Sequence, residues 1–207
     1  MEDKDALAEL SSIKSIMERS TRFISLSGLS GVMAGVYALI GAGLTYKLLY
    51  INKSDGTVNF YDDLVSELFF IASAVFVLSI TTGIWLTYRK ATRKGQRIWN
   101  QSSRLLLISG TLPFLTGGCF VLILLFEGYF ALVAPSCLIF YGLSLVSASQ
   151  YTFGDVKWLG ICDIGLGLIS TLLPGFGLYF WAIGFGLLHI VYGTIMHFKY
   201  DRESSAN

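Results

Sequence analysis

Apolar residues fill six long stretches of this chain, and polar residues are concentrated in the segments between them. A helix needs about 20 apolar residues to cross the hydrocarbon core of a bilayer. The pattern therefore predicts an all-α, polytopic membrane protein with a six-helix transmembrane domain over residues 25–200 and a cytoplasmic tail at 201–207. The predicted membrane-spanning helices cover residues 28–50, 64–88, 105–126, 129–150, 156–173 and 176–198.

Two of the connections are very short. Little more than Glu127 and Gly128 separates the third and fourth stretches, and the turn sequence LPGFG around Pro174 and Gly175 separates the fifth and sixth. Glycine and proline at such places are typical of tight turns between antiparallel helices. The sequence thus predicts a compact bundle of antiparallel hairpins.

The segment before the first stretch has a different pattern. From Asp5 to Ile24 the apolar residues recur at spacings of three, four or seven, which predicts a cytoplasmic amphipathic helix within residues 1–24. Such a helix lies on the inner membrane surface or packs beneath the bundle. A short coiled-coil contact between two copies is the less favoured alternative, because fewer than three clean heptads are present.

Composition and charge agree with a membrane location. The mean hydropathy is +0.63 and only 14% of the residues are charged, whereas soluble domains have about a quarter. With the predicted spans, 13 of the 15 lysine and arginine residues fall on one side, which places both termini in the cytoplasm. The basic segment 89–104 is explained by this orientation, so we expect a protein of the inner membrane and no nucleic-acid partner.

Glycine is frequent in three of the predicted spans. Helices approach closely in a bilayer where small residues share a face. The pattern predicts close contacts among the first, fifth and sixth helices, either within the chain or with another copy or a membrane-protein partner. The small residues concerned are Ser27, Gly31, Gly35, Gly160, Gly165, Gly167, Gly177, Gly184, Gly186 and Gly193.

Two polar side chains stand out inside the spans. A charge at the bilayer centre costs about 2.5 to 3.5 kcal/mol on insertion scales. At 1.5 Å per residue, Asp163 lies about 10 Å and His189 about 13 Å from the same side of the membrane. We therefore predict a polar core pair that shares a proton. The alternatives are a purely structural hydrogen-bonded pair, or an Asp163 that reaches the interface because its helix starts later.

The sequence favours transport over catalysis. It contains no zinc-protease, nucleophile-elbow, Walker or dinucleotide motif. We predict no cofactor and no metal site, because Cys162 and Asp163 are adjacent and point about 100° apart on a helix. The leading hypothesis is a transporter or channel for a small solute or ion, with proton coupling at Asp163 and His189. The alternative is a non-catalytic scaffold, sensor or accessory subunit, and an enzyme acting on lipid or quinone ranks last.

Overall fold

The computed structural model of the chain describes residues 27–51, 60–93, 95 and 99–201, and all regular structure within them is helical. The last helix, residues 177–201, is one continuous rod of four segments, two of which are π-helical. The predicted N-terminal helix and the tail after residue 201 lie outside the described residues. The elements are α2 (Gly28–Tyr46), η1 (Lys47–Ile51), α3 (Phe60–Arg93), α4 (Gln101–Phe126), η2 (Phe130–Leu132), α5 (Val133–Ala148), η3 (Ser149–Tyr151), α6 (Asp155–Leu172), α7 (Gly177–Trp181), η4 (Ala182–Leu188), α8 (His189–Met196) and η5 (His197–Asp201).

Five of these helical rods, all except α6, are long and apolar enough to cross a membrane by length and composition. α6 has 18 residues, and three of them are charged: Asp155, Lys157 and Asp163. The prediction of an all-helical chain with several long apolar helices is confirmed over the described residues, and such helices indicate an integral membrane location.

Several boundaries differ from the predicted ones. α3 extends beyond its apolar stretch at both ends, and α4 begins at Gln101, where the Asn100 side chain accepts a hydrogen bond from the Ser103 backbone N–H at 2.8 Å. The backbone hydrogen bonds of a helix continue through polar residues, and the helix ends only where a capping residue binds its terminal backbone groups. An apolar run therefore marks the membrane-compatible part of a helix and underestimates its length.

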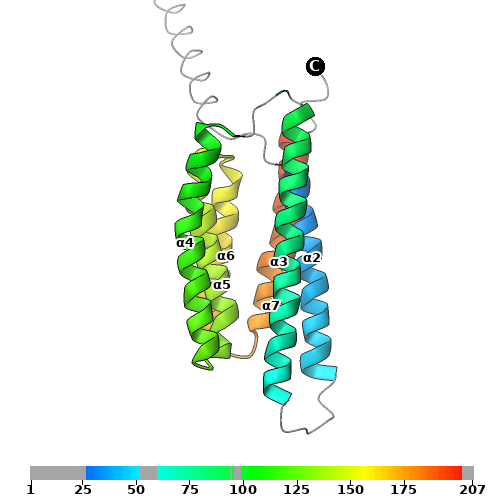
Figure 1. Cartoon of the computed structure of the whole chain (residues 1–207), viewed down its shortest axis with the longest axis vertical. Helices are drawn as coiled ribbons and strands as arrows, with labels where there is room; N and C mark the ends of the chain where they lie inside the picture. The colour runs from blue at the N-terminus through cyan, green and yellow to red at the C-terminus, as the bar shows by residue number, and fades with distance from the viewer. Residues whose placement is uncertain (1–26, 52–59, 94, 96–98, 202–207) are drawn as a thin grey trace, which may run out of the picture.

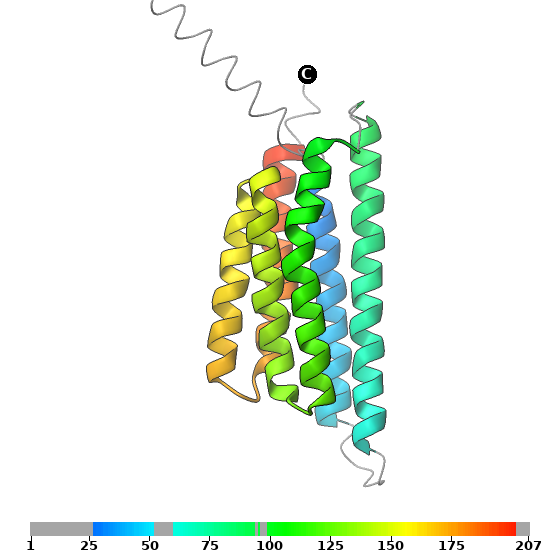
Figure 2. The same ribbon diagram turned by 60° about the vertical axis from the view of Figure 1, so that its left-hand side comes forward.

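The helices form two groups that lie side by side (Figures 1 and 2). In one group α5 packs between α4 and α6, and in the other α2 packs between α3 and the last helix. The two groups meet where α5 and α6 contact the last helix. The last helix has its most extensive contact with α2, although α6 precedes it in the sequence.

Glycines allow α2 and the last helix to approach at backbone distance. A Cβ atom added at Gly193 would lie 2.6 Å from the Val32 backbone nitrogen, and one at Gly35 would lie 2.6 Å from the Gly186 carbonyl oxygen. No side chain fits at either position without movement of the helices. The predicted close contact between the first and sixth helices is confirmed.

The glycines of α6 have a different neighbour from the one predicted. A Cβ at Gly160 would meet the Gly142 carbonyl oxygen at 2.6 Å, and one at Gly167 would meet the Pro135 carbonyl oxygen at 2.9 Å. Both partners belong to α5, the fourth of the predicted spans, so these α6 glycines allow the close contact between α6 and α5. The expectation that they pack tightly on the first or sixth helix is wrong, because α6 turns this glycine face toward α5.

Candidate functional site

Asp163 lies on the inner face of α6, between the two glycines that contact α5. Its side chain is fully buried, with 0% exposure, and neither carboxyl oxygen has a hydrogen-bond partner among the described residues. A Cβ added at Gly184 of η4 would lie 2.9 Å from Asp163 Oδ1. The absence of a side chain at Gly184 thus provides the space that the carboxyl group occupies.

A second unpartnered polar side chain lies on the same face of α6. The Ser170 hydroxyl is buried and has no hydrogen-bond partner in the described part of the chain. It follows Asp163 by seven residues, which is about two helical turns. Buried polar groups without partners cost about 1 to 3 kcal/mol each, so this face of α6 is energetically unfavourable.

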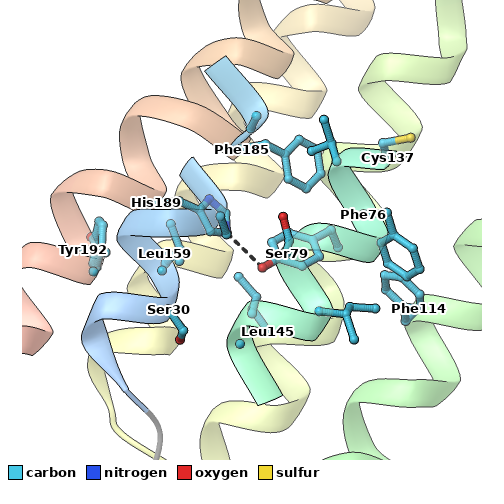
Figure 3. A pocket seen from close by; sticks show the side chains of 18 of the residues that line it. Ser30, Phe76, Ser79, Phe114, Cys137, Leu145, Leu159, Phe185, His189 and Tyr192 are labelled. Atoms are coloured by element: carbon cyan, nitrogen blue, oxygen red, sulfur yellow. Dashed lines mark hydrogen bonds between the residues drawn. The ribbon is translucent and has the colours of Figure 1, made fainter. Parts of the chain in front are cut away.

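His189 is buried, with 5% exposure, and both of its ring nitrogens have partners. Nδ1 lies 2.8 Å from the Gly184 carbonyl oxygen, and Nε2 lies 2.8 Å from the Tyr141 hydroxyl. In Figure 3 a dashed line that begins at His189 marks a hydrogen bond of its ring. A carbonyl oxygen only accepts, so Nδ1 carries a hydrogen. In the neutral ring Nε2 is then the acceptor, and Tyr141 donates its hydroxyl hydrogen to it.

No hydrogen bond joins Asp163 to His189 in the described structure. The two residues instead converge on Gly184: the imidazole donates to its carbonyl oxygen, and Asp163 lies against its α-carbon. Tyr141 provides a second link, since its hydroxyl bonds His189 and lies within electrostatic range of the Asp163 carboxyl group. The predicted residues are neighbours on adjacent helices, and their connection is indirect.

A cavity of about 530 Å³ lies beside this network, between the two groups of helices. It is lined mostly by aliphatic and aromatic side chains from α2, α3, α4, α5, α6 and the last helix. Tyr141, His189 and Ser79 are among its few polar lining residues, and Figure 3 labels the last two. Asp163 is not among the lining residues, whereas Tyr141 and His189 of the same network are.

Aromatic rings form one wall of the cavity. Trp181, Phe185 and His189 follow one another at intervals of four residues on the last helix, and their successive ring centroids are 5.1 and 6.0 Å apart. The Tyr141 ring packs against both Phe185 and His189, at 5.0 and 5.4 Å. This stacking fixes the plane of the imidazole and of the phenol.

Ion pairing occurs at the ends of the helices. Asp155, the first residue of α6, accepts hydrogen bonds from Lys199 Nζ at 2.9 Å and from the Tyr200 hydroxyl at 2.7 Å. Partial burial acts to raise the pKa of Asp155, but the hydrogen bonds from Tyr200 and Lys199 outweigh it and the pKa is lowered from its ordinary value. This cluster joins the start of α6 to the end of the last helix.

Residues suited to metal binding are not gathered in the described structure. No group of three histidine, cysteine, aspartate or glutamate side chains that could hold a metal ion occurs among the described residues. The Cys162 sulfur lies 4.0 Å from the Tyr192 hydroxyl, on the side of α6 next to the last helix.

Comparison with known protein families, with curated proteins and with solved structures finds no match. Sequence reasoning singled out Asp163 and His189 but missed Tyr141, which contacts one of them and is near the other. The regular spacing of Trp181, Phe185 and His189 was the one signal that could have marked the wall on which Tyr141 packs.

Proposed function

We propose that this protein is a membrane transporter that carries a small solute through the cavity between its two groups of helices, with proton coupling at Asp163. In this proposal six helices span the inner membrane and both termini face the cytoplasm, as the distribution of lysine and arginine favours.

The fully buried, unpartnered carboxyl group of Asp163 is the observation that carries the proposal. An ionised carboxylate without a partner is costly inside a bilayer, so such a residue is retained where it binds a proton or a cation. Tyr141 and Tyr192 have an electrostatic connection to it, and neither supplies a positive charge. A proton is the counter-charge that fits without further ligands.

Coupling requires that the charge on Asp163 affects the cavity. Tyr141 meets this requirement, because it lines the cavity, holds His189 by a hydrogen bond and lies within electrostatic range of Asp163. A negative charge on Asp163 opposes the lone pairs of the Tyr141 oxygen, and a proton on Asp163 removes that repulsion. Loading of a proton and binding of a solute would thus act on the same hydroxyl group.

The last helix contains a structural feature suited to movement. Its η4 segment is π-helical and contains Gly184 and Gly186, and π-helical segments are often found at functional sites. A change between π- and α-helical hydrogen bonding in η4 would rotate His189 relative to the preceding residues. This segment is therefore the hinge that we assign to the transport cycle.

Flux measurements in proteoliposomes test the proposal. The purified protein is reconstituted with a pH-sensitive dye inside, and a panel of small solutes is added outside, in Na⁺ and in choline buffer. We expect solute-dependent proton movement in the wild type and in the control variant Asp155→Asn, and none in Asp163→Asn. Unchanged flux in Asp163→Asn, or flux that needs Na⁺ and moves no protons, would show that the coupling is wrong. Absence of flux with every solute would remove the transport proposal itself.

A further inference from the structure

α3 and α4 together form one wall of the cavity. α3 packs against α2, and α4 packs against α5. Across the interval between α3 and α4, the rings of Phe76 and Phe114 stack with centroids 5.7 Å apart and planes 11° apart. Both rings line the cavity and remain accessible, at 45% and 36%.

The next turn of α3 also presents an accessible apolar residue to the cavity. Ile80 lines the cavity on α3 and is 44% exposed. In a bilayer an exposed apolar surface of this kind contacts acyl chains. A molecule dissolved in the membrane can therefore reach the cavity by displacing two phenyl rings, without passing through water.

The interior offers apolar contact and a few polar groups. The cavity volume of about 530 Å³ lies within the range of about 300 to 1,000 Å³ that holds drug-sized ligands. Its polar lining residues include Tyr141, His189 and Ser79. A ligand of this cavity should therefore have a mostly apolar body and a polar end directed at these polar residues.

The direction of the hydrogen bonds sets the chemistry of that polar end. His189 Nδ1–H donates to the Gly184 carbonyl oxygen, so the neutral ring accepts the hydroxyl hydrogen of Tyr141 at Nε2. The Tyr141 oxygen has then used its hydrogen and retains a lone pair. It is an acceptor, and it selects a ligand whose polar end carries a donor, such as a hydroxyl or an amine.

We infer that the cavity binds a membrane-soluble amphiphile with an apolar body and a hydroxyl or amine group, which enters from the bilayer between Phe76 and Phe114 and hydrogen-bonds to Tyr141. The inference rests on the proposed function, for which it names the class of solute. It concerns binding, which can be measured without any flux.

Quenching of Trp181 provides the measurement, because this residue lines the cavity. A variant with Trp85, Trp99 and Trp158 changed to phenylalanine leaves Trp181 as the single tryptophan, and the three that are removed are well exposed. The protein is placed in lipid nanodiscs and titrated with ω-bromododecanol, whose bromine quenches tryptophan on contact. We expect saturable quenching above the linear quenching that the bilayer-dissolved probe produces.

Two glycines allow the cavity to be filled without strain. Gly83 and Gly118 line the cavity, and a Cβ added at either has no atom within 4 Å. Gly83→Phe and Gly118→Phe should therefore fold and should abolish the saturable quenching. Gly43→Phe and Gly165→Phe are matched controls, since these glycines also have open space but do not line the cavity. Saturable quenching that persists in both filled variants places the probe elsewhere and overturns the inference.

The methyl ether of the same probe tests the hydrogen bond. It has the same apolar body and no donor, so we expect it to bind about two- to tenfold more weakly than the alcohol. Tyr141→Phe should remove this difference by weakening the alcohol alone. Equal affinity of alcohol and ether in the wild type would contradict the assigned role of Tyr141.

The results separate this inference from the transport proposal. Saturable, donor-dependent binding without any flux in proteoliposomes supports the cavity ligand and refutes transport. Proton-coupled flux of a water-soluble solute, with no saturable quenching by the alcohol, supports transport and refutes the amphiphile.

Discussion

Replacement of Asp163 by leucine should stabilise the protein while removing its function. Leucine has the same number of side-chain heavy atoms as aspartate and needs no hydrogen-bond partner. Asp163 is fully buried and both carboxyl oxygens lack a partner among the described residues. Each buried polar group without a partner costs about 1 to 3 kcal/mol, so we expect a net gain of about 1 to 3 kcal/mol in the free energy of unfolding.

Steric crowding sets the lower end of this range. The space beside Asp163 Oδ1 is limited, because a Cβ at Gly184 would lie only 2.9 Å away, and a methyl group is larger than an oxygen atom. Asp163→Asn therefore serves as the isosteric comparison. It removes the possible charge but keeps two polar groups, so its stability should fall between those of the wild type and the leucine variant.

Thermal unfolding in detergent, followed by circular dichroism, measures the effect. For a chain of about 200 residues, 1 kcal/mol corresponds to about 2 to 4 °C in Tm. We expect the order leucine, asparagine, wild type from most to least stable. A loss of stability of similar size in both variants would show that the Asp163 carboxyl group has a strong partner, and the argument from its isolation would fail.

Three further substitutions test the packing and the polar contacts. Gly193→Ala places a Cβ 2.6 Å from a backbone nitrogen of α2 and should destabilise the protein by about 1 kcal/mol net. In Gly165→Ala the added Cβ meets no atom within 4 Å, so this variant should be more stable than the wild type by about 0.5 to 1 kcal/mol in the same unfolding assay. Ser144→Ala removes a 2.7 Å hydrogen bond to α4 and should lower the free energy of unfolding by about 0.5 to 1.5 kcal/mol. Ser170→Ala removes an unpartnered hydroxyl and should leave that free energy unchanged. Equal losses in the two variants would contradict the assignment of partners. The pKa of Asp155 is lowered, so its contribution to stability is present above pH 3.8 and is lost as the pH falls through the folded-state pKa. The Tm difference between wild type and Asp155→Asn should therefore shrink on acidification. A constant Tm difference would refute the pairing.

Much of the fold follows from the sequence because long apolar helices leave few alternatives. The apolar stretches predicted the long helices, and the small residues of the first and last helices predicted the contact in which Gly193 meets the backbone of α2. The neighbour of α6 was not predictable in the same way. A glycine such as Gly160 permits close approach by any helix, and only the assembled bundle determines that this helix is α5.

The candidate site was predicted in part. Counting residues from the span ends predicted Asp163 and His189 at similar depth on adjacent helices, and in the structure both side chains lie beside Gly184. Whether the two side chains point toward each other depends on the rotation of each helix about its own axis. The π-helical segment η4 lies just before His189 and alters that rotation, and no rule of composition marks it in the sequence. Tyr141 was missed because a single tyrosine in an apolar span carries no charge to single it out.

Infrared difference spectroscopy on the reconstituted protein tests most directly whether Asp163 binds and releases a proton inside the bundle. A protonated carboxyl group in a dry site has a C=O stretching band that disappears when the proton leaves. We predict such a band in the spectrum of the wild type as the pH is changed, its retention in Asp155→Asn and its loss in Asp163→Asn. A pH-difference spectrum of Asp163→Asn that is identical to that of the wild type would show that Asp163 does not exchange a proton, and the proposed coupling would be wrong.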